Sequence, residues 1–223
     1  MIRIFDIIFS FILIIVFSPL FLVIILLLRF TGERKIFFFQ ERLGLNKKKF
    51  MVYKFVTMLE NSPNIGAGSI TEKNDPRILP LGKILRKTKI NELPQVLNVI
   101  KGEMSFIGPR PHVERDLEGI PEINLNKVLS VTPGLSGVAS IIFRDEDKII
   151  HQFKNGREFY DSFIAPYKAE LEIWYLDHYS FKNYIRFIFL TIFKILNFPK
   201  INIFEVFPSL PSPPNELKDY ISD

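Results

Sequence analysis

The stretch KINELPQVLNVIKGEMSFIGPRP, Lys89 to Pro111, sets a carboxylate, a short apolar segment and an arginine between two prolines in close succession. Leu93 precedes a proline and is biased away from helical backbone, whereas Pro94 suits the first turn of a helix. The segment PQVLNVIK is therefore predicted to form two helical turns, and Gly102 is placed to end them.

Charged side chains surround the predicted start of this helix. Asn91 and Glu92 lie at or just before its N-terminus, where free N–H groups and the helix dipole favour negative charge. Downstream, GPRP holds Arg110 between residues of restricted φ, and a guanidinium binds phosphate oxygens through a two-pronged fork. The basic residues that precede this helix start are Lys83, Arg86, Lys87 and Lys89. The pattern predicts a site that holds a phosphate group.

Each of these features also has a plainer explanation. Glu92 can serve only as a partner of the helix dipole or of Arg86, and such pairs are more often structural than catalytic. The lysines can form a solvated or membrane-facing surface, and an arginine flanked by prolines also occurs in ordinary turns. Taken singly, none of these features establishes an enzyme.

Composition limits the classes of function. With 223 residues, the chain can bury one sizeable core. It contains no cysteine, which excludes disulfides, thiol nucleophiles and cysteine zinc sites, and its three histidines are not at ligand spacing. A net charge of +5 suits nucleic acid or an anionic membrane, but no nucleic-acid recognition motif accompanies it. We therefore expect no nucleic-acid partner.

An apolar run near the N-terminus indicates a membrane. Residues 7–28 carry no charge, and a helix of that length, at roughly 1.5 Å per residue, covers a hydrocarbon core of about 30 Å. A secretory signal has a shorter apolar region and a cleavage site of small residues. Ser18-Pro19 near the midpoint predicts a kink. Basic residues at both ends, Arg3 and Arg29, are compatible with both ends on one membrane face, and a kinked spanning helix is the alternative.

Short segments of different character follow the apolar run. Residues 36–44 and 50–58 are aromatic and β-branched, which predicts a hairpin or two short strands. Residues 59–82 are dense in turn-forming residues and predict a long loop, after which a helix resumes. Residues 181–196 predict an amphipathic helix, which lies at a membrane interface or packs on the core of the protein.

The order of these motifs resembles the bacterial sugar transferases, the monotopic phosphoglycosyl transferases that begin lipid-linked glycan synthesis. The resemblance runs through most of the chain, and its long central motif is highly specific. The shared segments are RIFDI before the apolar run, Ser18-Pro19 inside it, FFFQERLG, YKFVTM, DPRILPLGKILRK, NELPQVLNVIKGEMSFIGPRP and TPGLSG.

The resemblance implies an α+β, mostly helical fold: a single membrane-associated catalytic domain with an N-terminal re-entrant membrane helix and amphipathic interfacial helices. Residues 1–30 are the re-entrant helix, which breaks at Ser18-Pro19 and returns to the same leaflet. Residues 31–200 are the sugar transferase domain on the cytosolic surface of the membrane. Residues 201–223 are proline-rich and polar, which predicts a disordered tail. The expected location is the cytoplasmic face of the bacterial inner membrane.

The implied reaction joins a soluble donor to a lipid acceptor. A sugar 1-phosphate passes from a nucleotide diphosphate sugar to polyprenyl (undecaprenyl) phosphate, a nucleoside monophosphate is released, and Mg²⁺ assists. This step initiates the synthesis of capsule, exopolysaccharide, O-antigen or glycoprotein glycans. Membrane lipid and downstream glycosyltransferases are the further expected partners. The usual mechanism is covalent: an Asp of an Asp-Glu pair attacks the phosphorus nearest the sugar, and the lipid phosphate then displaces the enzyme.

The resemblance also assigns roles to residues of this chain. Glu92 and Asn91 take the catalytic positions, and Arg86, Arg110 and Lys54 neutralise the diphosphate. The positions that support the site or form a substrate loop are Pro94, Gln95, Asp75, Arg77 and Gly134. The resemblance assigns no metal ligand to a residue of this chain.

The chain departs from the family at the nucleophile. Asn91 occupies the position of the attacking Asp, and a neutral amide is a poor nucleophile. Glu92 attacks instead, or another carboxylate such as Asp145 or Glu146 enters the site. The third explanation is a catalytically silent homologue, a scaffold that binds lipid phosphate or glycosyltransferases. Further departures are Val56, where the family has a basic residue, and the segment GLSGVASIIFRDED. They fit either a divergent branch with altered donor recognition or relaxed constraint.

Overall fold

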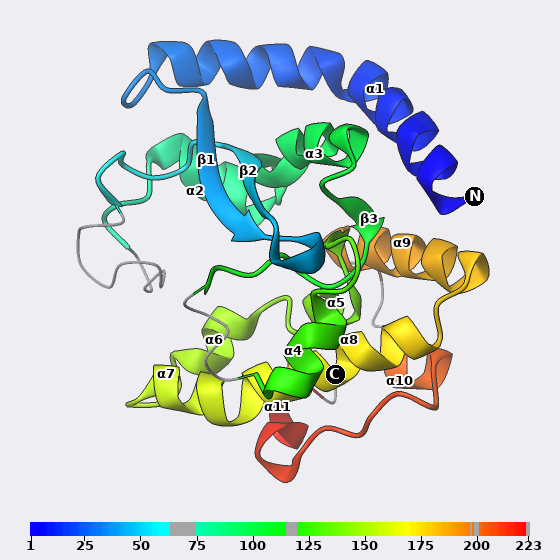
Figure 1. Cartoon of the computed structure of the whole chain (residues 1–223). Coiled ribbons are helices and arrows are strands. Elements are labelled where there is room, and N and C mark those ends of the chain that lie inside the picture. The colour runs from blue at the N-terminus through cyan, green and yellow to red at the C-terminus, as the bar shows by residue number, and fades with distance from the viewer. Residues whose placement is uncertain (63–74, 115–119, 197, 199–200, 222–223) are drawn as a thin grey trace. The chain divides into compact units, whose positions relative to one another are not determined.

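The computed structural model describes residues 1–62, 75–114, 120–196, 198 and 201–221. The chain forms two compact units: unit 1 comprises Met1–Glu41 and Met51–Gly102, and unit 2 comprises Arg42–Phe50 and Glu103–Asp223. Helices dominate the described residues and the strands are short (Figure 1), which confirms the α+β, mostly helical class. The apolar N-terminal helix packs within unit 1.

The apolar run forms one long helix, α1 (Ile2–Phe30), whose N-terminal half packs against α3 (Val96–Lys101). The Arg3 guanidinium donates hydrogen bonds to the carbonyl oxygens of Val99 and Ile100, the latter at 2.6 Å. These carbonyls lie in the last turn of α3, where backbone acceptors lack helical partners and a cation is favoured. Arg3 therefore caps α3 and fixes the start of α1 on unit 1.

The C-terminal half of α1 packs on the core of unit 1. Ile24 and Leu28 are buried in one cluster with Phe55 and Leu85. Burying an Ile or Leu side chain contributes about 1.5–3 kcal/mol, so this contact holds the helix along the unit. The large apolar side chains that α1 exposes include Ile4, Ile8, Phe11, Ile12, Ile15, Val16, Leu22, Val23, Leu26 and Leu27. By length and composition, α1 is long and apolar enough to cross a membrane.

Pro19 bends α1 without interrupting it. Pro19 has no N–H for the carbonyl of Ile15, and the Ser18 hydroxyl donates to that oxygen at 2.8 Å. The helix therefore continues from Ile2 to Phe30, with a bend visible in Figure 1. The kink predicted at Ser18-Pro19 is therefore present, and serine supplies a hydrogen bond where proline removes one.

The rest of unit 1 is built from short elements. Its strands are those predicted in residues 36–44 and 50–58, and they form a two-stranded sheet. A helix resumes within the predicted loop 59–82, and Gly102 ends α3 with φ +84°, as predicted. Residues 63–74 of that loop lie outside the described residues. The bounds are β1 (Phe37–Leu43), η1 (Leu45–Lys47), β2 (Lys49–Phe55), α2 (Pro80–Lys87) and the 3-10 helix η3 (Ile90–Gln95), with η1 and its flanks assigned to unit 2.

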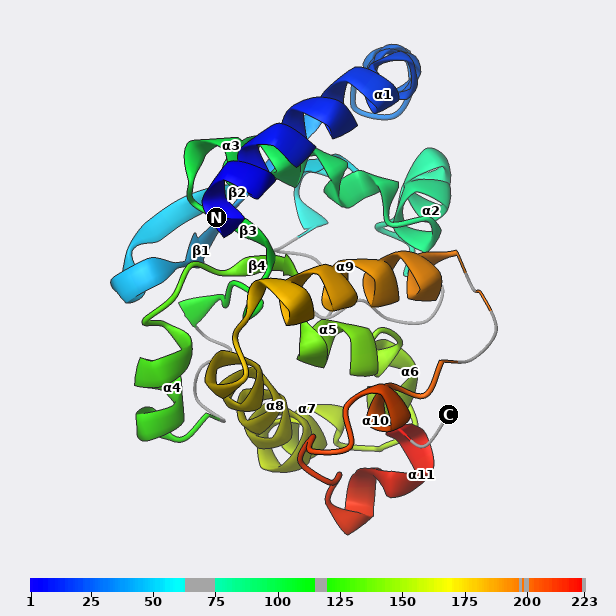
Figure 2. The same cartoon turned by 90° about the vertical axis from the view of Figure 1, so that its right-hand side faces the viewer.

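Unit 2 contains a parallel pair of short strands, β3 (Ser105–Ile107) and β4 (Gly134–Ser136). Helix α5 (Val138–Ile142) follows β4 and lies between α8 (Ala165–Asp177) and α9 (Phe181–Ile195), as Figure 2 shows. Further helical segments are α4 (Glu122–Val128), α6 (Glu146–Ile150), α7 (Gly156–Phe159) and the π-helical turn η5 (Tyr160–Ile164).

Helix α9 confirms the amphipathic helix predicted over residues 181–196. Tyr184, Phe187 and Leu190 are buried in unit 2, whereas Phe189 and Leu196 are more than half exposed. The helix therefore packs on the core of the protein and also presents apolar side chains on its outer surface. The packing on the core confirms one of the two alternatives drawn from the sequence, and the membrane interface stays a prediction.

The C-terminal segment is folded up to residue 221. It contains α10 (Ile203–Val206), η6 (Asn215–Leu217) and α11 (Lys218–Ile221). Leu217 is fully buried, and Phe207 and Leu210 are each 6 % exposed. The prediction of a disordered tail is therefore wrong for residues 201–221, because the apolar residues among its prolines are buried in unit 2.

An aromatic contact fastens this segment to α8 and α9. The ring of Phe207 stacks on Phe187 with centroids 4.8 Å apart and meets Trp174 nearly edge-on at 5.5 Å. The hydroxyl of Tyr167 donates to the carbonyl of Pro211 at 2.8 Å. The segment thus covers apolar surface of two helices that would otherwise face solvent.

Phe207→Ala is expected to destabilise the protein by about 3 kcal/mol, because it removes a buried aromatic ring from this contact. Val206→Ala, at the neighbouring exposed position, is the matched control and is expected to change the free energy of unfolding by less than about 0.5 kcal/mol. Thermal and denaturant unfolding of the purified protein in detergent measure both. Equal stability of the two variants would contradict the folded tail.

Candidate active site

The Asn91-Glu92 pair lies in the 3-10 turn η3, directly before α3. The helix predicted from Pro94 begins at Val96 instead, because the preceding residues form a 3-10 turn that includes a hydrogen bond from the Glu92 N–H to the Lys89 carbonyl. Ile90, the first residue of the turn, packs against the cluster that contains Ile24 and Leu28 of α1. The pair therefore lies next to the apolar helix within unit 1.

Asn91 and Glu92 differ in exposure and in partners. Asn91 is buried, and its Oδ1 has no hydrogen-bond partner among the described residues. The Glu92 carboxylate is 20 % exposed and lies 3.9 Å from the Nζ of Lys54, whose side chain is 17 % exposed. Leaving a buried polar atom without a partner costs about 1–3 kcal/mol. The turn thus presents a carboxylate, a cation and an oxygen that a further ligand can use.

A buried amide places Lys54 beside this turn. Asn98 of α3 is fully buried; its Oδ1 accepts from the N–H of Tyr53 at 3.1 Å, and its Nδ2 donates to the carbonyl of Met51 at 2.7 Å. Asn98 therefore satisfies backbone groups of β2 and ties that strand to α3. Because Lys54 follows Tyr53, this contact sets the position of Lys54 against Glu92.

Other residues predicted for the site support the turn. Pro94 and Gln95 are buried at the end of η3. Arg86 is partly buried in α2, which contacts η3, and its Nη1 lies 3.8 Å from the Sδ of Met58. Arg86 therefore belongs to the helix beside the Asn91-Glu92 turn.

Asp75 and Arg77 form a buried ion pair. The Asp75 carboxylate oxygens accept from Nε and Nη2 of Arg77 at 2.6–3.1 Å, and Nη1 donates to the carbonyl of Ser62 at 2.8 Å. The two side chains are 2 % and 4 % exposed. Because removing one partner would leave a buried charge, this pair is a structural support that ties Ser62 to the residues before α2.

In unit 2, Arg110 follows the β3–β4 pair. Beyond β3, the Gly108 N–H donates to the carbonyl of Ser136 at 2.9 Å, and the Gly134 N–H donates to the carbonyl of Pro109 at 2.8 Å. A Cβ on Gly134 would lie 2.1 Å from the Gly108 nitrogen, so only glycine allows this approach. The TPGLSG segment therefore holds the GPRP segment that carries Arg110.

The sequence profile of the bacterial sugar transferases matches residues 1–198, which cover both the Asn91-Glu92 turn and the Arg110 segment. The chain belongs to the bacterial sugar transferase family. It is 37 % identical over 158 residues to the exopolysaccharide production protein ExoY of Rhizobium meliloti, an alignment that covers 65 % of this chain and 70 % of that protein.

Two longer relatives have names that specify their substrates. The UDP-glucose:undecaprenyl-phosphate glucose-1-phosphate transferase of Klebsiella pneumoniae is 33 % identical over 86 % of this chain and 39 % of its own length. The UDP-N-acetylgalactosamine-undecaprenyl-phosphate N-acetylgalactosaminephosphotransferase of Aeromonas hydrophila is 33 % identical over 86 % of this chain and 42 % of its own length. The chain therefore spans less than half of these two relatives.

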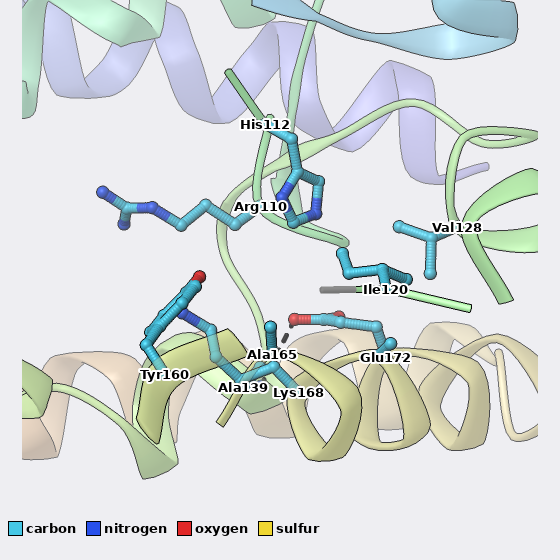
Figure 3. Close-up of a pocket in the computed structure, with 10 residues that line it drawn as sticks. Arg110, His112, Ile120, Val128, Ala139, Tyr160, Ala165, Lys168 and Glu172 are labelled. Atoms are coloured by element: carbon cyan, nitrogen blue, oxygen red, sulfur yellow. Dashed lines mark hydrogen bonds between the residues drawn. The ribbon is translucent and has the colours of Figure 1, made fainter. Parts of the chain in front are cut away.

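In this sugar transferase, Arg110 also lines a small cavity within unit 2 (Figure 3). The cavity has a volume of about 10 Å³, close to the space that one water requires, so it is too small for a nucleotide sugar. Its polar lining residues are Arg110, His112, Tyr160, Lys168 and Glu172. The cavity belongs to the surroundings of Arg110 and is not the substrate site itself.

The charged groups around this cavity carry an excess of positive charge. Burial is the largest influence on Lys168 and opposes its charge, but the Glu146 carboxylate at 2.7 Å and Tyr160 together outweigh burial, so the pKa of Lys168 is raised. Burial, and then the charges of Lys168, Arg42 and Arg110, lower the pKa of His112 to about 3, so His112 is neutral at pH 7. Three cations, Lys168, Arg42 and Arg110, and one carboxylate, Glu146, thus act on His112.

Glu172 of α8 adds a neutral carboxyl group. It is 4 % exposed; its Oε1 accepts from the Ala139 N–H at 3.3 Å, and its Oε2 has no partner within the described part of the chain. Burial, opposed by the Ala139 N–H and by Lys168, raises the pKa of Glu172 to about 8. The protonated side chain holds the start of α5, directly after the TPGLSG segment.

The other candidate nucleophiles have ionic partners of their own. Glu146 neutralises the buried Lys168, and freeing it for attack would leave that cation unpaired. Asp145 lies 3.4 Å from Lys148, and its side chain is 63 % exposed. Asp145 and Glu146 therefore each have a lysine partner, as Glu92 has in Lys54.

A magnesium ion fits this chain only with help from a substrate. Among the residues that the structure describes, no group of three or more His, Cys, Asp or Glu can hold a metal. Mg²⁺ is commonly bound by one or two protein oxygens together with substrate phosphates. The Glu92 carboxylate and the unpartnered Asn91 Oδ1 are adjacent oxygen donors of this kind.

Sequence reasoning missed Asn98, Lys168 and Glu172. Lys168 and Glu172 lie four residues apart on α8 among apolar neighbours, a spacing that puts both on the buried face. Asn98 stands inside the apolar segment VLNVI. In each case the available signal was a polar residue within an apolar helical face.

Raising the pH from 6.5 to 8 is expected to lower the stability of the protein. The pKa of Glu172 is about 8 in the folded state and 4.5 in the unfolded state, so the folded protein binds one more proton between these values and stability falls as pH rises. His112 contributes only below pH 6.5, because its folded pKa lies below its unfolded value. Melting temperatures in detergent at half-unit pH steps measure this decline.

Glu172→Gln is expected to reduce the fall in melting temperature with rising pH, because the amide does not titrate. Its oxygen still accepts from the Ala139 N–H. Glu170→Gln, at an exposed position on the same helix, is the matched control and is expected to keep the parent slope. A Glu172→Gln variant with the parent slope would show that Glu172 is not protonated in the folded state.

Proposed function

We propose that this chain transfers a sugar 1-phosphate from a UDP-sugar to polyprenyl phosphate, with release of UMP, as the initiating step of lipid-linked glycan synthesis. The observation that carries the proposal is the Glu92 carboxylate beside Lys54, in a turn whose Ile90 packs near the apolar helix α1. A turn in this position can meet a soluble donor and a lipid acceptor. The names of the two longer relatives, which specify UDP-sugars and undecaprenyl phosphate, support these substrate classes.

The packing of α1 supports a re-entrant placement in the membrane. Arg3 contacts the last turn of α3, and Ile24 and Leu28 pack on the core of unit 1, so both halves of α1 contact the same compact unit. In a straight spanning helix, these halves would lie toward opposite faces of a hydrocarbon core about 30 Å thick. We place both ends on the cytoplasmic face of the bacterial inner membrane, where the soluble donor is available.

Glu92 supplies the nucleophile in the first of two steps. One carboxylate oxygen forms a bond to the phosphorus nearest the sugar, and the bond from that phosphorus to the bridging oxygen breaks, so UMP leaves with the electron pair. Lys54 stabilises the negative charge of this step. In the second step, an oxygen of polyprenyl phosphate attacks the same phosphorus, and the Glu92 carboxylate leaves. The division suits one soluble and one membrane-confined substrate.

Asn91 orients a ligand in this proposal and does not attack. Its buried Oδ1, which has no hydrogen-bond partner among the described residues, would hold Mg²⁺ together with the Glu92 carboxylate and the phosphates of the donor. The metal, when bound, neutralises charge on the diphosphate. Asn91 itself keeps an uncharged oxygen at the place where the family has a carboxylate.

Arginines provide the remaining charge for the diphosphate. Arg110 lies in the cluster of unit 2 in which Arg42 and Lys168 add positive charge, and Arg86 lies on α2 beside the Glu92 turn. Hydrogen bonds from a guanidinium to phosphate are roughly twice as strong as neutral ones. The resemblance to the family assigns Arg110 to the phosphate oxygens of the donor.

Asn91 also favours a second candidate function. A chain without the attacking Asp of the family can serve as a catalytically silent scaffold that binds lipid phosphate or downstream glycosyltransferases at the membrane. Under this alternative, Glu92 only fixes Lys54. The two functions differ in one observable, the release of UMP from a UDP-sugar.

Glu92→Gln is expected to lower UMP release by at least about 10²-fold, because the amide cannot form the bond to phosphorus. The assay contains purified protein in lipid nanodiscs, Mg²⁺, undecaprenyl phosphate, and UDP-glucose or UDP-N-acetylgalactosamine. Glu60→Gln, at an exposed carboxylate of unit 1, is the matched control and should retain the parent rate.

Asn91→Asp separates the two functions. If Glu92 is the nucleophile, the parent releases UMP and Asn91→Asp changes the rate while Glu92 remains essential. No release by the parent from either donor, with release appearing in Asn91→Asp, would establish the silent scaffold and rule out the transferase activity of the natural chain.

A further inference from the structure

Helix α9 carries a buried hydroxyl that contacts β3. Tyr184 is fully buried, and its hydroxyl oxygen accepts from the Phe106 N–H at 3.1 Å and lies 2.9 Å from the Oγ of Ser105. A strand N–H that has no neighbouring strand on one side must find another acceptor. Tyr184 supplies this acceptor from a helix and thereby fixes β3 laterally.

A second hydroxyl on the same helix contacts β4. Thr191 lies two turns after Tyr184, and its Oγ1 is 2.8 Å from the Oγ of Ser136. The Thr191 hydroxyl donates its proton to the carbonyl of Phe187 at 2.8 Å. Ser136 is therefore the donor to Thr191, since a hydroxyl has only one proton to give.

The two strands held in this way lead into the segments that carry site residues. Ser105 pairs with Gly134 and Ile107 with Ser136, and Arg110 follows three residues after the end of β3. The chain between Ile107 and Arg110 consists of one glycine and one proline, so a shift of β3 passes directly to the arginine. Lateral support of β3 and β4 is thus support for Arg110.

We propose that Tyr184 and Thr191 are positioning residues, which hold the β3–β4 pair so that Arg110 meets the phosphates of the donor. The inference rests on the proposed function, because it concerns the same arginine and the same diphosphate. An arginine that binds the diphosphate in the ground state and in the transition state alike affects donor affinity and KM more than kcat.

The variants remove or keep single hydroxyls. Tyr184→Phe removes only the hydroxyl of Tyr184, and Thr191→Val replaces the Thr191 hydroxyl with a methyl group. Thr191→Ser keeps the hydroxyl and is the conservative rescue. Tyr179→Phe removes the hydroxyl of a tyrosine that is 54 % exposed in the same unit and serves as the matched control.

The measurements are UDP affinity by calorimetry with Mg²⁺ and without acceptor lipid, donor KM and kcat with undecaprenyl phosphate, and the melting temperature. Tyr184→Phe and Thr191→Val are expected to weaken UDP affinity and raise the donor KM by about fivefold, the scale of one lost hydrogen bond. Their kcat is expected to stay within about twofold of the parent. Thr191→Ser and Tyr179→Phe are expected to match the parent in affinity and KM.

The outcomes separate the positioning role from the proposed function. Lower melting temperatures with unchanged UDP affinity and KM would reduce Tyr184 and Thr191 to structural residues and overturn the inference alone. A parent that binds UDP without turnover, with weaker binding in both variants, would overturn the transferase function and support the positioning role. A parent that binds no UDP would overturn both.

Discussion

The packing of one apolar helix along unit 1 is the contact on which the site depends. Arg3 caps α3, while Ile24 and Leu28 enter the core, so both halves of α1 are held by the unit that carries Glu92. Because Ile90 packs against the same cluster, the packing of α1 and the geometry of the Asn91-Glu92 turn depend on one cluster.

The charge of the turn explains how an amide and a carboxylate can work together. Two adjacent carboxylates would repel each other, and a partner such as Lys54 would have to compensate both. Because Asn91 is neutral, Glu92 is the only carboxylate of the Asn91-Glu92 pair, and its Oε1 lies 3.9 Å from the Nζ of Lys54. The Asn91 oxygen remains available to a metal or a phosphate-bound ligand. Under the proposed function, the departure from the family places the reacting charge on Glu92.

Sequence patterns predict the parts of this fold that are local. Apolar length predicts α1, aromatic and β-branched runs predict β1 and β2, and Gly102 marks the end of α3 because its backbone has positive φ. The pattern predicts the kink at Pro19 but not that the helix continues through it. The Ser18 hydrogen bond compensates for proline only once the helix has formed.

Sequence patterns do not predict contacts between segments that are far apart in the chain. Asn98 meets β2 more than forty residues away, and Tyr184 meets β3 nearly eighty residues away. No periodicity encodes such pairs. The tail shows the same limit: its proline content is typical of disorder, yet Phe207 finds an aromatic surface on α8 and α9 that exists only after unit 2 has folded.

The most direct measurement is the intact mass of the purified protein after incubation with UDP-sugars and Mg²⁺ in the absence of polyprenyl phosphate. The predicted result is a gain of one sugar phosphate per chain, which maps to Glu92 in peptide fragments and disappears when undecaprenyl phosphate is added. UMP release that needs the lipid and leaves the protein mass unchanged would contradict the role of Glu92 as the nucleophile, as would a sugar phosphate on any other residue.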